Sequence, residues 1–211
     1  MRKSIVHISI VLDVVCPWCY IGKRRLEKAM EWNKDRFEFV VRYEPFELNP
    51  ELPIEGIRLK QHLVQKFGSL EAYNQVVDHV TQVAAREGLR FDFANQHISP
   101  NTRKAHQLLA FAVTEGKQVK LKEAFLSAYF ERGIDLSKTE NLIDIALTAG
   151  LPSSASRKVL SENLFYDQVV EEENRNHQRG IRGVPFYIIN QHYGLSGAQP
   201  PEVFSKVFAE I

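Results

Sequence analysis

Near the start of the chain, two strand-like hydrophobic patterns flank a helical one. Residues 4–15 are rich in β-branched side chains and too short for a comfortable helix, so they predict a strand. In the segment 36–48, Phe37, Phe39 and Val41 occupy alternate positions and predict a second strand. Between these segments, hydrophobic residues recur near helical spacing. A strand–helix–strand unit of this kind should place its two strands parallel in one sheet.

The middle of the chain, residues 51–164, is predicted to be all-helical. Ser69 precedes one helical segment as an N-terminal cap, and Ser137 with Glu140 has the spacing of a capping box before another. Three helical segments are followed by a glycine suited to a C-terminal cap, namely Gly88, Gly116 and Gly133. Because no convincing strand interrupts this stretch, we expect a helical domain inserted into the opening unit.

The last part of the chain, residues 165–211, returns to the opening pattern. A helix over 165–178 precedes the strand-like sequence VPFYII, which is followed by a short strand or turn and a closing helix. We therefore predict an α/β protein in which residues 1–50 and 165–211 form one domain and residues 51–164 form the helical insertion.

Composition and charge exclude several classes of function. The formal net charge is +1, which gives no bulk attraction to nucleic acid or to an anionic membrane. The clusters KRR at 23–25 and EEE at 171–173 are interpreted as solvated helix faces. No apolar stretch approaches the length that spans a bilayer. His7 and Asp13 interrupt the apolar N-terminal segment, which argues against a signal peptide and favours a cytoplasmic protein.

The two cysteines of the chain, Cys16 and Cys19, form a CPWC motif at the junction of the first strand and helix. In a reducing compartment such a pair points to transient redox or metal chemistry rather than to a structural disulfide. Cys16 should lie beside the unpaired N–H groups of the helix, which favour its thiolate, and Pro17 suits the first helical turn. Cys19 lies one turn further along the same face. We therefore expect Cys16 to be the exposed, attacking thiol and Cys19 the hidden, resolving one.

Half of a zinc site is the alternative reading of two cysteines at this spacing. Such a site needs two further ligands, and the seven histidines of the chain show no matching pattern. We expect no metal.

A proline opens the last long strand-like segment, in the sequence GVPF at residues 183–186. Proline removes a ladder hydrogen bond from a strand that otherwise reads as buried, and a cis peptide between Val184 and Pro185 resolves that conflict.

The order of these motifs resembles the thioredoxin-fold DsbA family over essentially the whole chain. In detail it is similar to the cytoplasmic, FrnE-like branch of thiol–disulfide oxidoreductases and isomerases. Four segments carry this resemblance: DVVCPWCYIGKRRLEKA at 13–29, SPNTRKAHQLLAFA at 99–112, GVPFYIIN at 183–190 and GLSGAQPPEVF at 194–204. The resemblance implies a thioredoxin-like fold with an inserted helical domain, redox roles for Cys16 and Cys19, and a cis Pro185 beside them.

Other residues are secondary candidates. Trp18 is expected to frame the thiol, and Asp13 reads more readily as a solvated or capping residue than as a buried acid that exchanges protons with Cys19. We expect Asn101 to cap a helix and His106 to make a core-edge contact. In glutathione-using relatives the region corresponding to Ser196, Gly197, Ala198 and Gln199 holds the γ-glutamyl end of the peptide, which suggests a substrate-binding turn here.

The predicted function is dithiol–disulfide exchange on a protein disulfide or a small-molecule thiol substrate, with no cofactor beyond the cysteine pair and with glutathione as a candidate co-substrate. Two alternatives stay open. One is a glutathione-dependent transferase or isomerase of the kappa-class or hydroxychromene-carboxylate isomerase type, although such relatives usually carry serine in place of the first cysteine. The other is a redox-controlled binding protein or chaperone. The oligomeric state is left open.

Overall fold

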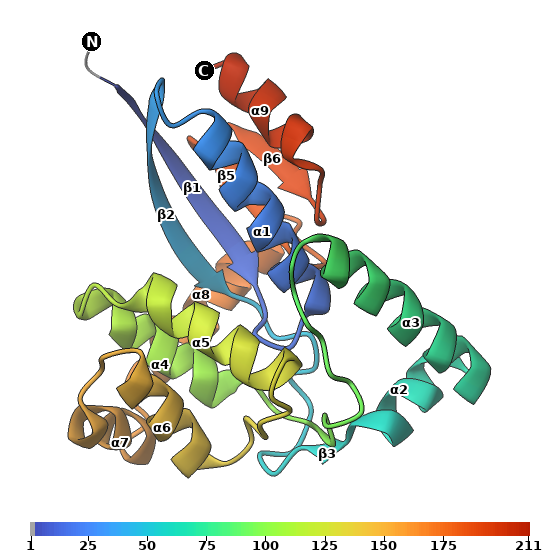
Figure 1. Ribbon diagram of the computed structural model, residues 1–211. Helices are drawn as coiled ribbons and strands as arrows, with labels where there is room; N and C mark the ends of the chain where they lie inside the picture. The colour runs from blue at the N-terminus through green and yellow to red at the C-terminus, as the bar shows by residue number, and fades with distance from the viewer. Residues whose placement is uncertain (1–2) are drawn as a thin grey trace.

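The computed structural model describes residues 3–211, which are built around one mixed β-sheet (Figure 1). In chain order the elements are β1 (Ser4–Leu12), α1 (Pro17–Trp32), β2 (Phe37–Pro45), β3 (Ile57–Arg58), α2 (Leu59–Phe67), α3 (Leu70–Arg86), β4 (Ile98–Ser99), α4 (Arg103–Thr114), α5 (Gln118–Phe130), α6 (Thr139–Thr148), α7 (Ser153–Ser161), α8 (Tyr166–Gln178), β5 (Phe186–Ile189), β6 (Tyr193–Ser196) and α9 (Pro201–Ala209). The sheet order is β2–β1–β5–β6. Strand β1 is parallel to β2, as predicted, and antiparallel to β5, which pairs antiparallel with β6.

Strand β1 lies inside the sheet and carries the hydrophobic core. Val6, Ile8 and Ile10 are buried at alternate positions, and Val11 and Leu12 are both buried at the carboxyl end. Neighbouring residues can both be buried there because helices cover both faces of the sheet: α1 and α9 pack together in front of it, and α8 lies behind it (Figure 1). With both faces covered, the end of β1 becomes a fully enclosed position from which the chain enters α1.

The helices α2 to α7 lie between β2 and α8 in the chain, so the predicted helical insertion is present. The expectation that no strand interrupts it is wrong in one detail. Residues Ile57 and Arg58 pair antiparallel with Ser99 and Ile98 as a two-stranded ladder. Strands of two residues each show no periodicity in a sequence, and only the fold brings them together.

The predicted caps of α3 are present in the structure, and the predicted cap of α6 is not. The Ser69 side chain accepts a hydrogen bond from the backbone N–H of Ala72 at 3.0 Å, as an N-terminal cap does. Gly88, with a φ of 77°, takes the left-handed conformation expected after α3. The capping box at Ser137 is wrong, because Lys138 occupies the cap position of α6. The backbone N–H of Ser137 instead donates to Asp135 Oδ1 at 2.8 Å, within a turn.

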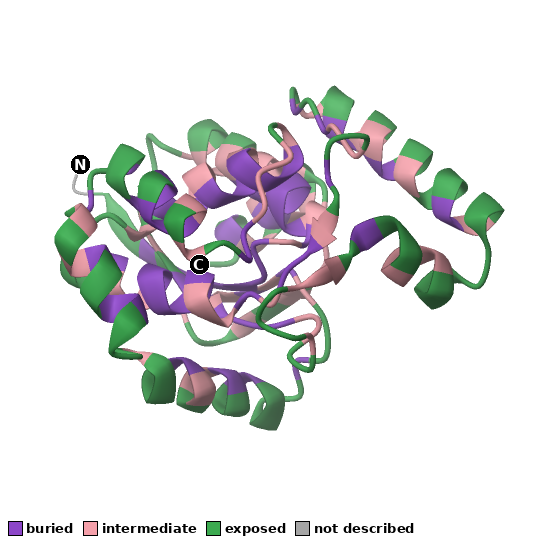
Figure 2. Cartoon of the chain, turned by 90° about the horizontal axis from the view of Figure 1, so that it is seen from below, coloured by how far each residue is buried: buried purple, intermediate pink, exposed green. Residues whose placement is uncertain are grey.

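Helices α2 and α3 form a hairpin that projects from the rest of the molecule (Figures 1 and 2). Its buried residues are Leu59 on α2 and Tyr73, Val80 and Ala84 on α3. Figure 2 shows that much of the hairpin surface is exposed or half-buried. The hairpin therefore reaches the main core through Val80 and Ala84 of α3, while the rest of it stands beside the sheet.

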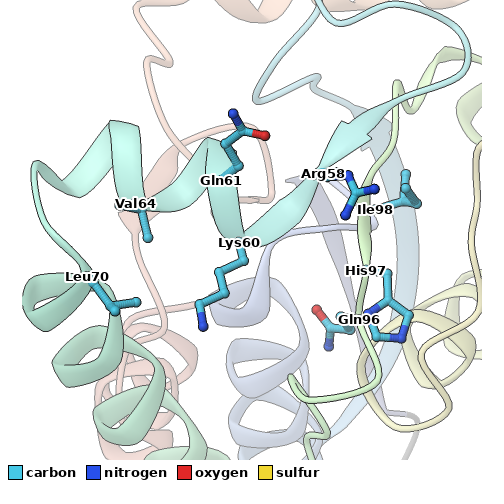
Figure 3. A pocket seen from close by; sticks show the side chains of 8 residues that line it. All are labelled: Arg58, Lys60, Gln61, Val64, Leu70, Gln96, His97 and Ile98. Atoms are coloured by element: carbon cyan, nitrogen blue, oxygen red, sulfur yellow. The ribbon is translucent and has the colours of Figure 1, made fainter.

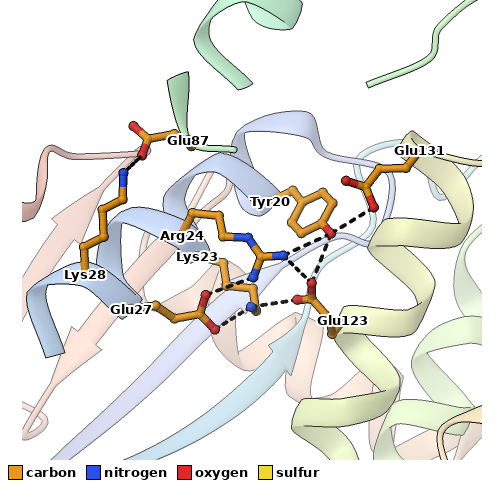
Figure 4. Close-up of polar contacts among 8 residues, drawn as sticks. All are labelled: Tyr20, Lys23, Arg24, Glu27, Lys28, Glu87, Glu123 and Glu131. Carbon is orange, nitrogen blue, oxygen red and sulfur yellow. Dashed lines mark hydrogen bonds and ion pairs between the residues drawn. The ribbon is translucent and has the colours of Figure 1, made fainter. Parts of the chain in front are cut away.

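The basic cluster at residues 23–25 does not face solvent as expected (Figure 4). Lys23 is buried and lies 2.7 Å from Glu123 of α5, and Arg24 lies 2.6 Å from the same carboxylate. Arg25 pairs with Glu87 at 2.7 Å. The Tyr20 hydroxyl also donates to Glu123 at 3.0 Å. These contacts join α1 to the helical insertion, and local sequence cannot show them because the acidic partners are distant in the chain.

The acidic cluster at residues 171–173 is likewise only partly solvated. Glu171 is exposed, whereas Glu172 pairs with Arg42 of β2 at 2.6 Å. Glu173 is buried. Helix α8 therefore turns its acidic residues toward both β2 and α4, which follows from its position between the sheet and the insertion.

Candidate active site

Cys16 occupies the N-cap position of α1, with an extended backbone at φ −91° and ψ 113°. Pro17 follows in the first helical turn, where its missing N–H costs no helical hydrogen bond. The backbone N–H of Cys19 donates to the carbonyl of Cys16 at 3.0 Å and closes the first turn. The two cysteines thus lie at one end of α1, and no disulfide joins them.

Both thiols are buried, which corrects the expectation of an exposed Cys16. Its exposed fraction is 3 %, and that of Cys19 is 2 %. The two cysteines differ in their access to a cavity of about 280 Å³. Cys16 lines this cavity, and Cys19 is not among the described residues that line it. Burial raises the pKa of Cys19 well above its ordinary value, and the neighbouring Cys16 raises it further.

The peptide bond between Val184 and Pro185 is cis, the geometry expected from the sequence. The Cys16 Sγ donates to the carbonyl oxygen of Val184 at 3.5 Å, and the side chain of Val184 also lines the cavity. The entrance to β5 therefore lies directly against the N-terminal end of α1, although the two segments are far apart in the sequence.

The cavity beside Cys16 has one wall from the sheet domain and one from the helical insertion. From the first come Val15, Cys16, Pro17, Trp18, Leu48, Asn49 and Val184; from the second come Leu59, Leu63, Lys66, Phe67, Val76, Val77, Val80, Phe93, Gln96, Ser99, Tyr129 and Phe130. Among the described residues, Lys66 is the one charged side chain in this lining. The ring of Trp18 lies 6.0 Å from that of His79 on α3, so Trp18 joins α1 to the hairpin. The cavity is thus mostly apolar with one cation near its edge.

A second, larger hollow of about 810 Å³ lies on another side of α2 (Figure 3). It is lined by Lys60, Gln61 and Val64 of α2 and by Leu70, Arg58, Gln96, His97 and Ile98. Gln96 borders both this hollow and the Cys16 cavity, whereas neither cysteine lines the hollow.

Asp13 is completely buried, which corrects the reading of a solvated or capping residue. Its Oδ2 accepts a hydrogen bond from the backbone N–H of Leu48 at 2.8 Å, which ties the ends of β1 and β2 together. Its Oδ1 lies 3.4 Å from Nε2 of His106 on α4. A carboxylate that ends a fully covered strand has no route to solvent, so it takes its partners from the protein.

His106 is more than a core-edge contact, because it belongs to a buried charge cluster of Asp13, Glu47, Arg103, His106 and Glu173. Arg103 pairs with Glu47 and lies 3.2 Å from Glu173. Burial alone lowers the pKa of His106, but the nearby carboxylate of Asp13, with the charges of Glu173 and Glu47, raises it above its ordinary value. Burial raises the pKa of Glu173 to about 7. Three acids here share two bases, and Glu173 is the acid among them whose pKa is raised.

The motif around α4 explains this arrangement. The expected helix cap at Asn101 is displaced by one residue, because Thr102 occupies the cap position of α4 and makes no side-chain cap hydrogen bond. The Asn101 Oδ1 instead accepts from the N–H of Arg103 at 3.0 Å, in the turn that enters the helix. Arg103 and His106 are three residues apart on the helix and share one face. That spacing was the available signal for the charge cluster, but the acids that complete it come from β1, the end of β2 and α8.

The turn of residues 196–199 lies beside Pro185 but is absent from the described lining of the Cys16 cavity. The N–H of Gly197 donates to the carbonyl of Pro185 at 2.8 Å, and Gln199 Nε2 donates to the carbonyl of Ser196 at 2.7 Å. The carbonyl of Ala198 accepts from Arg25 at 2.6 Å. A substrate-binding role for this turn stays a prediction.

Two further properties concern the described part of the chain. Within residues 3–211, no three His, Cys, Asp or Glu side chains are grouped so that they could hold a metal ion. In the same range, no helix has both the length and the hydrophobicity required to cross a bilayer.

Comparison with known proteins gives a consistent result. A family model described as the DSBA-like thioredoxin domain matches residues 7–209. The uncharacterized protein YwbO of Bacillus subtilis (strain 168) is 26% identical over 212 residues, covering 97% of this chain and 96% of that protein. The crystal structure of the probable DsbA oxidoreductase SCO1869 from Streptomyces coelicolor has a TM-score of 0.90 and 33% identity, covering 97% of this chain and 89% of that one.

A more distant solved structure shares the fold. The cytosolic disulfide reductase DsbM from Pseudomonas aeruginosa, solved with GSH, has a TM-score of 0.67 and 14% identity, covering 97% of this chain and 100% of that one. The predicted thioredoxin-like fold with a helical insertion is confirmed by the family match and by the likeness to SCO1869. Because the family model covers nearly the whole chain, this protein belongs to the DSBA-like thioredoxin domain family.

Proposed function

We propose that this protein is a dithiol–disulfide oxidoreductase of the reductase or isomerase type, with Cys16 and Cys19 as its redox centre. The observation that carries the proposal is the asymmetry of the pair. Cys16 stands at the N-terminus of α1 and borders the cavity, while Cys19 lies behind it with a raised pKa. The sulfur that a substrate meets is thus the one beside the unpaired helix N–H groups, which stabilise a thiolate.

The reaction proceeds in two exchanges. The Cys16 thiolate attacks one sulfur of a substrate disulfide, forms a mixed disulfide, and releases the other substrate sulfur as a thiolate. Cys19 then loses its proton and attacks Cys16 Sγ. The Cys16–Cys19 disulfide forms, and the second substrate sulfur leaves as a thiolate that takes up a proton from water. The substrate gains two electrons and the protein dithiol loses two. In an isomerisation, the substrate's own thiol attacks the mixed disulfide in place of Cys19.

We propose that substrate occupies the cavity of about 280 Å³ between the redox domain (1–50 and 165–211) and the helical insertion (51–164). The apolar lining suits the uncharged neighbours of a disulfide, and Lys66 suits an anionic group at one side. Pro17, Trp18, Val184 and Pro185 frame the thiol in this proposal. Ser196, Gly197, Ala198 and Gln199 form a separate binding turn for the polar end of a substrate.

The oxidised pair must be reduced before another reductive cycle. We propose glutathione as the small-molecule thiol that does this, in the cytoplasm. The support is the likeness in fold to a cytosolic disulfide reductase whose structure was solved with GSH. A disulfide-bearing protein or small molecule is the proposed partner.

The decisive experiment compares Cys19→Ala with Cys16→Ala on a disulfide-bonded protein. Cys19→Ala should attack and then remain as a covalent adduct that reductant releases, because the chain has no third cysteine to resolve it. Cys16→Ala should form no adduct. Non-reducing electrophoresis and intact mass measure both. If Cys19→Ala keeps wild-type turnover, the dithiol mechanism is wrong, and a glutathione-transferase reading takes its place.

A further inference from the structure

The hollow of about 810 Å³ beside α2 carries positive charge that no acid of the described chain pairs with. Arg58 and Lys60 line it, and its described lining contains no acidic side chain. Within residues 3–211, neither of these two cations forms an ion pair. The basic cluster at 23–25 differs, because each of its members is paired with a glutamate. The hollow therefore favours a ligand with negative charge.

The N-terminus of α2 adds to this positive potential. The helix begins at Leu59, and its first turn contributes Lys60 and Gln61 to the lining of the hollow. No side chain caps this end of the helix, and its first turn contains no acid. The first backbone N–H groups of a helix have no partner within the helix, and the helix dipole favours an anion beside them. The helix end and the two cations thus act in the same direction.

A buried polar side chain sets a second requirement for the ligand. Gln96 is 5 % exposed and lines the hollow, and Figure 3 shows its amide pointing into it. The Gln96 Nε2 donates to the carbonyl of Phe130 at 3.4 Å, whereas its Oε1 has no hydrogen-bond partner within the described chain. A buried acceptor without a donor is costly, so a ligand gains free energy by supplying an N–H or O–H here. The ligand should carry hydrogen-bond donors as well as negative charge.

Gln96 also connects the hollow with the Cys16 cavity, because it lines both. The two spaces lie on adjacent faces of α2. Leu63 lines the cavity, and Val64, the next residue of the helix, lines the hollow. An extended chain whose disulfide lies at Cys16 can therefore continue past Gln96 into the hollow.

We propose that the hollow binds an acidic segment of a protein substrate, adjacent in the substrate to the disulfide that Cys16 attacks. The inference rests on the proposed dithiol function and names the substrate class for it. Carboxylates of the segment pair with Arg58 and Lys60, and one of its backbone N–H groups donates to Gln96 Oε1. A small anion satisfies the charges, but it does not extend from the hollow to Cys16.

The test measures how fast the full-length reduced protein attacks two disulfide-linked peptide pairs in a single turnover. One pair carries glutamates beside its cysteine, and the other carries glutamines at the same positions. Separation of a fluorophore from a quencher reports the attack, and each rate is divided by that of dithiothreitol on the same pair to remove differences in intrinsic reactivity. At low ionic strength the wild type should favour the acidic pair about tenfold, and added salt should reduce this preference.

The double variant Arg58→Gln with Lys60→Gln should lower the preference to about twofold or less and keep the rate on the neutral pair within about twofold. Lys120→Gln with Lys206→Gln is the matched control. It removes the same charge from two exposed residues that line neither space. This control should retain the wild-type preference, because the proposal places the effect in the hollow and not in the net charge.

Equal loss of preference in the two double variants would overturn the inference. Equal rates of the wild type on both pairs would also overturn it. If the wild type then bound inorganic phosphate in calorimetry, and Arg58→Gln with Lys60→Gln abolished that binding, the hollow would be a site for a small anion instead. Failure of the wild type to attack either pair is a separate outcome, which would refute the proposed dithiol function itself.

Discussion

Replacing the buried acid Glu173 by glutamine should stabilise the protein above neutral pH. Glu173 is buried in the charge cluster, its Oε2 lies 3.2 Å from Arg103, and its Oε1 has no hydrogen-bond partner within the described chain. Arg103 also forms an ion pair with Glu47, so one guanidinium is shared between two carboxylates. The ionised form of Glu173 is therefore poorly compensated.

The magnitude follows from the pKa of Glu173, which burial, opposed by His106 and Arg103 but reinforced by Glu47, raises from 4.5 to about 7. Below pH 4.5 both the folded and the unfolded carboxyl hold a proton, so no penalty exists. Between pH 4.5 and about 7 the unfolded state ionises and the folded state does not, so the free energy of unfolding falls with rising pH. At about 1.4 kcal/mol per pKa unit, the loss approaches an upper bound of about 3.5 kcal/mol above pH 7.

The assay is urea unfolding of the wild type and Glu173→Gln at pH 5 and at pH 8.5, since urea adds no ionic screening. The two proteins should be close in stability at pH 5, where glutamine replaces a neutral acid. At pH 8.5 the variant should be more stable by up to about 3.5 kcal/mol, or roughly 7–14 °C in Tm for a chain of this size. The charge of Glu173 also raises the pKa of His106, so the difference reports on Glu173 together with its interaction with His106.

Glu171→Gln is the matched control, because it removes an exposed acid two positions away on the same helix. Its stability should follow the wild type at both pH values. A Glu173→Gln variant that is less stable than the wild type at pH 8.5 would show that Glu173 is ionised and usefully paired with Arg103. A difference that is the same at both pH values would also refute the reasoning.

Two further changes test the packing and the cavity. Gly22→Ala should destabilise the protein by about 1–3 kcal/mol in thermal unfolding, because the added Cβ would lie 2.2 Å from the Tyr187 hydroxyl. The control is Gly183→Ala, whose added Cβ meets nothing within 4 Å. Adding Tyr187→Phe to Gly22→Ala should restore part of the lost stability. If Gly22→Ala gains stability from helix propensity, the close approach of α1 and β5 is wrong. Lys66→Glu should slow attack on an anionic disulfide such as oxidised glutathione about fivefold, and should leave attack on a cationic disulfide such as cystamine unchanged. Lys60→Glu, on the same helix but in the other hollow, is the control and should slow attack on oxidised glutathione less. Equal slowing by the two variants would place the substrate elsewhere.

The sequence by itself determined the framework of this protein. Periodicity near the N-terminus predicted the parallel pair β1 and β2 with α1 between them, and these elements are present. The CPWC motif predicted two cysteines at the start of a helix, and the conflict between Pro185 and its strand predicted the cis peptide observed there. These features were accessible because helix ends, strand alternation and proline geometry depend on residues close together in the chain.

Only the tertiary structure decided which polar side chains are buried and what they meet. Asp13, Lys23 and Glu173 have sequence surroundings that suit solvated residues, yet each is buried against partners from other elements. The burial of Cys16 likewise depends on Val184 and on the α2–α3 hairpin, which lie far from it in the sequence. The physical reason is that the free energy of the whole packed structure determines whether a charged side chain is solvated or paired with another residue. A local sequence pattern does not contain that information.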